Sequence, residues 1–181
     1  NVFVSSGSDN SYSNDNILSK QKIIKGDFLT VNTRIEVEPD SEIMLLFSSG
    51  AMAWLGENSN LSLDKFLQKS FDTSDKKISE LDEAVSTSKL SLGLNLGELI
   101  VDIKKLDKES TFEVKTVLGV AGVRGTAFKL SASISKSTLS VVEGNVEYIQ
   151  STRNKIEVLK SEQVVIEKNA APVFNDLEEK E

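Results

Sequence analysis

Short apolar runs that alternate with polar residues and stop at turn-forming residues recur along most of this chain. Arg34-Ile35-Glu36-Val37-Glu38 alternates polar and apolar side chains and stops at Pro39-Asp40-Ser41. Glu42 to Phe47 and Met52 to Leu55 flank Ser48-Ser49-Gly50-Ala51, which is typical of a hairpin loop. A period of two places successive side chains on opposite faces of a strand. The pattern therefore predicts an all-β fold, either an antiparallel sandwich or a solenoid-like stack of short strands and hairpins.

The length of 181 residues suits one domain with short flanking segments. Residues 1–16 are rich in Ser, Asn and Asp and are predicted to form a flexible N-terminal spacer. The β domain is predicted over residues 17–168, and residues 169–181 are predicted to be a loose, acidic C-terminal tail. The acids and amides of the spacer lack the spacing of a calcium-binding loop, so no metal site is expected there.

Residues 64–89 depart from the strand pattern. They are rich in Lys, Asp, Glu and Ser, and Ile78, Leu81 and Val85 fall at helical spacing. Ser74 stands at a suitable position to cap the start of a short helix. We predict an exposed helical or loop insertion here, and we expect partner contacts from it because binding residues are often carried on loops.

The stretch from Val117 to Phe128 has the most unusual pattern in the chain. Gly119, Gly122 and Gly125 recur at every third residue among Val and Ala. The spacing is neither that of a dinucleotide-binding turn nor that of a phosphate-binding loop. Because glycine has no Cβ atom, the pattern predicts a sharp bend or a close contact between backbones.

A three-stranded meander is predicted after this stretch. Its strands are Thr126–Leu130, Leu139–Val142 and Val146–Ile149, and Glu143-Gly144-Asn145 is expected to be the second hairpin turn. Tyr148 shares a strand face with Val146, so we expect its ring in the core and its hydroxyl at the edge.

A faint internal repeat links three distant parts of the chain. Lys25-Gly26-Asp27-Phe28, Leu96-Gly97-Glu98-Leu99 and Lys160-Ser161-Glu162-Gln163 each place a small residue and an acid before a strand. The repeat predicts one supersecondary unit that is used more than once.

The composition excludes several classes of site. The chain has no histidine and no cysteine, so the ordinary zinc, copper and haem ligands and the usual catalytic triads are missing. The formal net charge is −7, which opposes nucleic-acid binding. The longest strongly apolar run is Ile43 to Phe47, too short to cross a bilayer. We expect no cofactor, and the chain starts at Asn1 without an initiator Met, which leaves room for a signal peptide or lipid anchor upstream.

Paired carboxylates remain as a route to hydrolysis. The chain holds 28 acids, so chance pairs are expected, and no motif selects any of them. Glu36 with Glu38, and Glu80 with Asp82 and Glu83, have the pattern of solvated faces. We therefore predict that the chain is not an enzyme.

Two motifs resemble those of a known family. Val123-Arg124-Gly125-Thr126-Ala127-Phe128 and Val142-Glu143-Gly144-Asn145-Val146 are similar to the hallmark turns of the FecR domain family. Weaker pieces occur upstream in the expected order, and the resemblance covers roughly Ile23 to Ile166. The glycine spacing and the two motifs together predict a structural turn made of Gly119, Gly122, Arg124, Gly125, Thr126 and Gly144.

The resemblance implies an exported β-rich domain. The best-known members are periplasmic parts of signal transducers that contact a TonB-dependent receptor, and other members are secreted or lipid-anchored envelope proteins. A transmembrane helix and an anti-sigma region do not appear in this chain, so a stand-alone, lipoprotein-like envelope member is the better match and sigma-factor regulation stays open. The expected partner is a protein or an envelope polymer, and the oligomeric state stays open.

Arg124 and Trp54 are the candidate partner contacts. Arg124 is one of three arginines, and its guanidinium is predicted to bond carbonyls or an acid within the turn in preference to a partner. Trp54 is predicted to pack in the core, with two alternatives, a protein contact and a sugar-stacking platform. We thus expect a non-catalytic binding or signalling module, with a carbohydrate-binding β-sandwich as the alternative.

Overall fold

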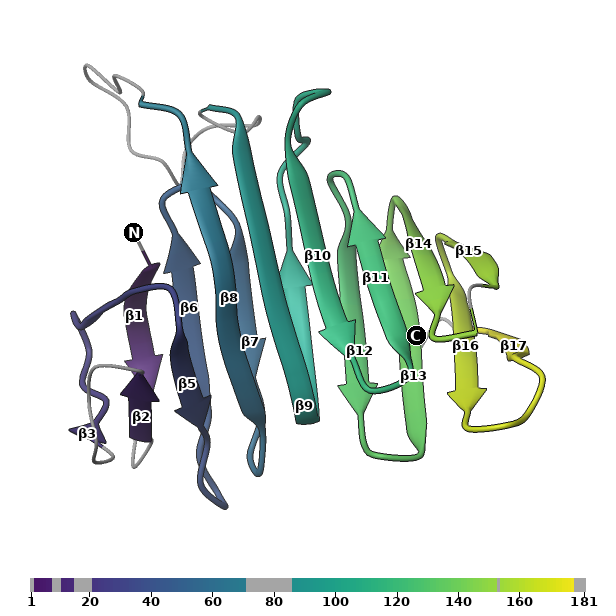
Figure 1. Cartoon of the computed structure of the whole chain (residues 1–181), viewed down its shortest axis with the longest axis horizontal. Coiled ribbons are helices and arrows are strands. Elements are labelled where there is room, and N and C mark those ends of the chain that lie inside the picture. Colours follow the sequence, from purple (N-terminus) through teal and green to yellow (C-terminus); the bar gives the residue numbers. More distant parts are fainter. Residues whose placement is uncertain (1, 8–10, 15–20, 71–85, 153, 178–181) are drawn as a thin grey trace.

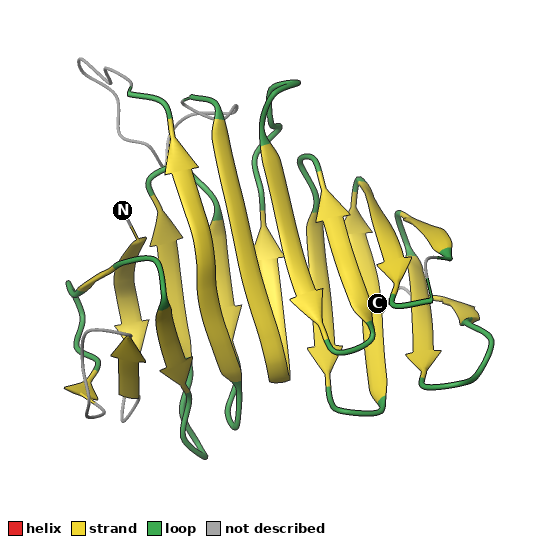
Figure 2. Cartoon of the chain, in the orientation of Figure 1, coloured by secondary structure: helices red, strands yellow, loops and turns green. Residues whose placement is uncertain are grey.

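The computed structural model describes residues 2–7, 11–14, 21–70, 86–152 and 154–177. These residues form 17 strands and no helix, arranged as two stacked layers (Figures 1 and 2). Layer A contains, in spatial order, β4 (Phe28–Leu29), β1 (Val2–Gly7), β6 (Ile43–Phe47), β7 (Met52–Leu55), the end of β9 (Ser88–Asp102), β12 (Ala127–Ala132), β13 (Lys136–Glu143), β16 (Glu162–Glu167) and β17 (Val173–Asp176). The all-β prediction is confirmed.

Layer B is built in the same way. It contains β3 (Gln21–Lys22), β2 (Ser11–Asn14), β5 (Thr33–Glu36), β8 (Asn60–Gln68), the start of β9, β10 (Thr111–Thr116), β11 (Gly119–Val123), β14 (Asn145–Gln150) and β15 (Lys155–Leu159). Strand pairing is antiparallel except between β9 and β10, which are parallel. The sheet is therefore mixed, and β9 joins the two layers because its two halves pair in different ones.

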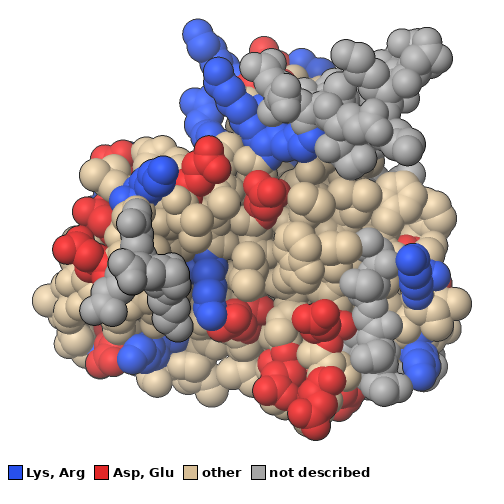
Figure 3. Space-filling model, turned by 180° about the vertical axis from the view of Figure 1, so that it is seen from behind, with Lys and Arg blue, Asp and Glu red and all other residues tan. Residues whose placement is uncertain are grey.

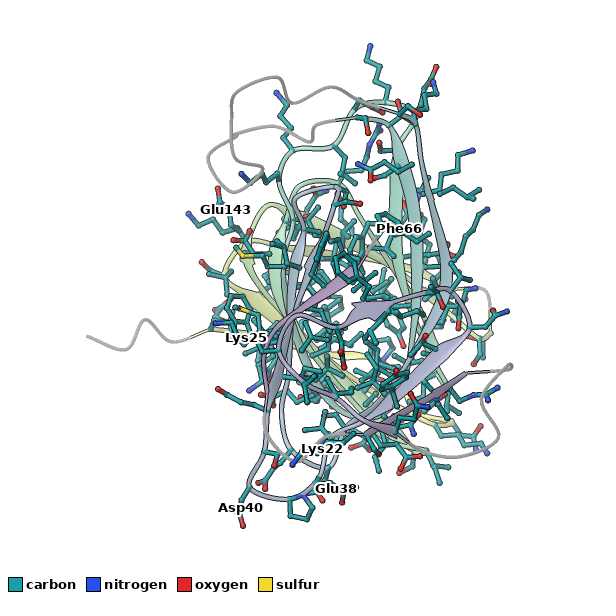
Figure 4. The ribbon with its side chains drawn as sticks, turned by 90° about the vertical axis from the view of Figure 1, so that its left-hand side faces the viewer. Lys22, Lys25, Glu38, Asp40, Phe66 and Glu143 are labelled. Atoms are coloured by element: carbon teal, nitrogen blue, oxygen red, sulfur yellow. The ribbon has the colours of Figure 1, made fainter. Side chains whose placement is uncertain are left out.

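The core lies between the layers. Leu61, Leu92 and Leu94 of layer B and Leu45 and Leu99 of layer A belong to one core cluster, and all five are fully buried. Figure 4 shows the layers edge-on with side chains filling the space between them, Phe66 among them. Alternation along each strand explains the layers, because every second apolar side chain enters this space.

Hairpins lie within one layer or the other, and the chain passes between the layers several times. A residue with positive φ stands at most of these passages. The chain enters layer A through Gly26, Asp40, Gly97, Gly125 and Ser161, each with positive φ. It leaves for layer B through Asn32, Asn58 and Gly144, which also have positive φ. The repeat of a small residue and an acid before a strand is therefore the device that carries the chain into layer A.

The predicted meander is wrong at its second turn. Strand β13 pairs with β12 and β16 in layer A, whereas β14 pairs with β11 and β15 in layer B. Glu143-Gly144-Asn145 is thus an arch between layers and not a hairpin. A left-handed glycine suits both kinds of turn, so local sequence could not separate them.

Segment boundaries also differ from the predictions. Strands β1 and β2 occupy much of the expected spacer, and Val2 and Val4 are buried in the core. Strand β8 runs to Gln68 and β9 begins at Ser88, so the excursion between them is shorter than 64–89; residues 71–85, which carry the predicted helix, lie outside the described residues. Strand β17 occupies part of the expected loose tail, because Val165 and Val164 of β16 leave an edge for it to pair with.

Candidate docking face

The outer face of layer A carries a row of apolar side chains centred on Trp54. Trp54 of β7 stands opposite Met44 of β6 on one side and Ile100 of β9 on the other. Cross-strand partners point to the same face of a sheet, and the neighbours Ala53 and Leu55 point the other way into the core. Trp54 is therefore partly exposed on the outside, and the prediction that it packs in the core is wrong.

A second apolar row runs beside the first. Phe28, Phe3, Leu46 and Met52 are successive cross-strand partners on β4, β1, β6 and β7. The rings of Phe3 and Phe28 lie 4.6 Å apart in a tilted arrangement. The two rows form one contiguous surface, which we call the apolar stripe: Phe3, Phe28, Met44, Leu46, Met52, Trp54 and Ile100.

The stripe faces solvent. Phe28 is 63% exposed and Ile100 is 44% exposed, and the other five side chains are partly exposed. In Figure 3, which looks onto this layer, uncharged residues form a broad central area with acidic groups below it. Single exposed apolar residues are ordinary, but contiguous ones mark interaction surfaces.

Acidic side chains border the stripe. Along the outer face of β9, Glu98, Ile100 and Asp102 alternate, so the isoleucine lies between two acids. Glu42 lies two residues before Met44, and Glu143 pairs with Ala127, the cross-strand partner of Asp102. We call Glu42, Glu98, Asp102 and Glu143 the acidic rim.

Two lysines also lie near this border. Lys129 stands beside Ile100 and forms an ion pair with Glu98 at 2.8 Å. Lys25, three residues before Phe28, lies with Glu143 on the outer side of layer A in Figure 4. One of the four acids of the rim, Glu98, is thus already paired with a lysine.

The predicted structural turn consists of two arches that touch. Gly125 has φ of +80° where the chain crosses into layer A, and Gly144 has φ of +80° where it returns to layer B. A Cβ on Gly144 would lie 2.7 Å from the Gly125 carbonyl oxygen. The Thr126 hydroxyl donates to the Asn145 carbonyl at 3.0 Å, which joins the arches directly.

The other turn glycines have different roles. Gly119 is buried at the start of β11 against β14, where a close approach of chains was predicted. Gly122 is not tightly packed, because an added Cβ would lie at an ordinary contact distance of 3.7 Å from the Glu147 carbonyl oxygen. The gap above Gly122 opens a hollow of about 400 Å³ on layer B between Glu113 and Glu147.

Arg124 lines that hollow and is exposed. Its guanidinium donates to the Asp107 carbonyl at 3.2 Å, a carbonyl of the β9–β10 connection that lies outside the predicted turn. Glu113 and Glu147 in the hollow form ion pairs with Lys115 at 3.6 Å and Lys155 at 2.5 Å. Both carboxylates are therefore ion-paired with lysines of the same layer.

The sequence held a signal for the stripe that pattern analysis missed. Ile43 to Phe47 is apolar at every position, and Met52 to Leu55 is as well. A half-solvated strand alternates, so a continuous run means apolar side chains on both faces. Among the described residues, no group of acids is arranged to hold a metal ion, and no helix is long and apolar enough to cross a membrane.

Comparisons with known proteins place the chain in a family. No curated protein sequence matches it. Two crystal structures, each described as a "putative anti-sigma factor" from Parabacteroides distasonis ATCC 8503, resemble it with TM-scores of 0.59 and 0.57 at 16% and 18% identity. They match over 79% and 82% of this chain, which spans 59% and 60% of theirs.

The family model described as FecR protein matches residues 33–147. This range runs from β5 to the start of β14 and includes both hallmark arches and most of the apolar stripe. The chain belongs to the FecR family.

Proposed function

We propose that this chain is a non-catalytic docking module of the bacterial cell envelope, exported to the periplasm or outer envelope. It binds a protein partner in a signalling pathway through the outer face of layer A. The observation that carries this proposal is the apolar stripe around Trp54, a contiguous, solvent-facing surface at the centre of a sheet. Family membership supports the regulatory role, as does the likeness to structures described as anti-sigma factors.

The surroundings of Trp54 favour a protein over a carbohydrate. A sugar platform needs hydrogen-bonding side chains beside the aromatic ring, because sugar hydroxyls are otherwise left unpaired. The direct cross-strand neighbours of Trp54 are Met44 and Ile100, which offer no hydrogen bonds, and the carboxylates of Glu98 and Asp102 lie only diagonally across β9. Large aromatic and Met side chains are enriched at the centres of protein interfaces.

The chemistry of the chain also favours binding over catalysis. It has no histidine or cysteine. The carboxylates that flank the hollow on layer B are paired with lysines. A hydrolase working through two carboxylates would need one of them protonated and both directed at a substrate.

The experiment compares variants of the full chain in envelope extracts. Trp54→Ala should abolish capture of the partner that the wild type retains, whereas Ile134→Ala should leave capture intact. Ile134 is a matched control because it is apolar and 75% exposed but lies in the turn between β12 and β13. Thermal melting of both variants shows that they fold. Equal capture by Trp54→Ala and the wild type would refute the proposal.

A further inference from the structure

We infer that the apolar stripe accepts an amphipathic protein segment that carries Lys or Arg beside its apolar side chains. This inference rests on the proposed function, because it names the chemistry of the partner at the same face. It follows from three properties of that face: its side chains, the pairing of its backbone groups within the sheet, and its charge.

The side chains of the stripe suit apolar contacts of variable shape. Trp54 offers a large flat ring, and its neighbours Met44 and Met52 have flexible thioether chains that adapt to a partner. Binding surfaces that accept amphipathic segments commonly use methionine in this way. The centre of the stripe therefore fits the apolar side of such a segment.

The backbone beneath the centre of the stripe has no free groups to offer a partner. Strand β6 pairs with β1 and β7, β7 pairs with β6 and β9, and β9 pairs with β7 and β12. A strand-addition mode needs an open edge, so it does not apply at the centre of this sheet. Recognition must come from side chains, as it does when an amphipathic segment lies across a surface.

The acidic rim sets the charge of the partner. Glu98 and Asp102 each lie two residues from Ile100 on β9, a distance of about 7 Å along a strand. That is within the Debye length of about 10 Å at 0.1 M salt. Glu98 is already paired with Lys129, so cationic side chains at the border of the apolar contact would meet Asp102 and Glu143, which favours a basic segment.

The same charges disfavour two other occupants. A membrane with anionic lipids would face the acidic rim and the net charge of −7. A second copy of this chain, packed stripe to stripe, would bring two acidic rims together. Both occupants are therefore outcomes that the experiment must separate from a basic segment.

Binding at this surface can be followed by tryptophan fluorescence, because Trp54 is the one tryptophan of the chain. The probes are two synthetic amphipathic peptides of equal length, one with Leu and Lys and one with Leu and Glu at matching positions. The Leu/Lys peptide should shift Trp54 emission to shorter wavelength and bind at least about tenfold tighter than the Leu/Glu peptide at 50 mM salt. The preference should shrink at 0.5 M salt because the rim is then screened.

Variants separate the apolar and the charged contributions. Ile100→Ser should weaken binding of the Leu/Lys peptide, whereas Ile134→Ser should not. The double variant Asp102→Lys/Glu143→Lys should remove most of the preference for Lys over Glu. Its control, Glu157→Lys/Asp176→Lys, makes the same change in net charge on β15 and β17, away from the stripe, and should retain the preference.

Four results would overturn the inference. They are equal or reversed preference between the peptides, no emission shift with either, a blue shift on vesicles of anionic lipid, and self-association that shifts emission without peptide. Each of these leaves the proposed function standing if Trp54→Ala still loses the captured protein. If Trp54→Ala retains that protein, the proposed function fails independently.

Discussion

Gly119 and Tyr148 touch so closely that a Cβ atom on the glycine would lie 2.6 Å from Cε1 of the tyrosine ring. The same Cβ would also collide with the carbonyl oxygen of Ile149. The Tyr148 ring is fully buried, and its hydroxyl lies 2.9 Å from the Thr116 hydroxyl. The glycine therefore makes room for the aromatic anchor of the core at this end of the molecule.

Gly119→Ala should destabilise the chain by about 2 kcal/mol or more, because backbone and a buried ring must both shift. Gly122→Ala is the matched control on the same strand, where an added Cβ meets nothing closer than 3.7 Å. We expect it to change stability by less than about 1 kcal/mol. Urea unfolding of both variants checks the difference, and equal midpoints would contradict the packing described here.

Gly125→Val should cost more than about 2 kcal/mol, because it combines a forbidden conformation with a clash. The φ of Gly125 is +80°, and an added Cβ would lie 2.8 Å from the Lys105 Cα. Gly26→Ala isolates the conformational part, since Gly26 has φ of +95° and nothing within 4 Å of an added Cβ. We expect it to cost about 1–2 kcal/mol. A Gly125→Val melting temperature near that of the wild type would refute the account of the arch.

The stability of the chain should fall above about pH 10 through Tyr148. Burial raises the pKa of the Tyr148 hydroxyl, and the hydrogen bonds from Thr116 and Ser137 only partly oppose it. The folded state thus holds this proton to higher pH than the unfolded state does. The stability that the protonated Tyr148 contributes is complete below the pKa of about 10 of the unfolded state. It is lost as pH rises through the higher pKa of the folded state.

Tyr148→Phe removes this titration. Its unfolding midpoint in urea should fall less steeply between pH 9 and 11 than that of the wild type. At pH 7 the variant should be less stable by about 1 kcal/mol, because the Thr116 hydroxyl loses a partner. Parallel pH profiles for the two proteins would argue against a buried, protonated tyrosine.

Arg124→Ala should change stability by less than about 1 kcal/mol, since its bond to the Asp107 carbonyl is exposed to water. It should also leave partner capture unchanged, because Arg124 lines the hollow on layer B and not the apolar stripe. Thermal melting and the capture assay check the two parts. Loss of capture in this variant would move the docking face to layer B.

The strands of this fold could be predicted from sequence far better than their pairing. Alternation in Arg34 to Glu38 and the Gly50 turn are local signals, and both appear in the structure as expected. Whether Gly144 starts a hairpin or an arch depends on Gly125, which is distant in sequence but in contact through space. The crossing of β9 at Gly97 likewise depends on Ser59, whose side chain and backbone lie against that glycine.

The candidate docking face is harder to predict than the hallmark turn. The sequence offers Trp54 as a partner contact, but large aromatics commonly fill small β cores, so it favours the inward position. The opposite faces of β7 are both apolar, so the register with β6 and β9 decides which residue points out. The core positions of Val2 and Val4 are hidden in the sequence, because the Ser- and Asn-rich residues that follow them dominate the composition of that segment.

Site-specific photo-crosslinking in the native cells tests the central claim most directly. A photoreactive amino acid is placed at Ile100 in the apolar stripe and, separately, at Ile134 in the β12–β13 turn. The account predicts a discrete adduct from position 100 with the protein that Trp54→Ala fails to capture, and no such adduct from position 134. An adduct with that protein from position 134 and none from position 100 would contradict it.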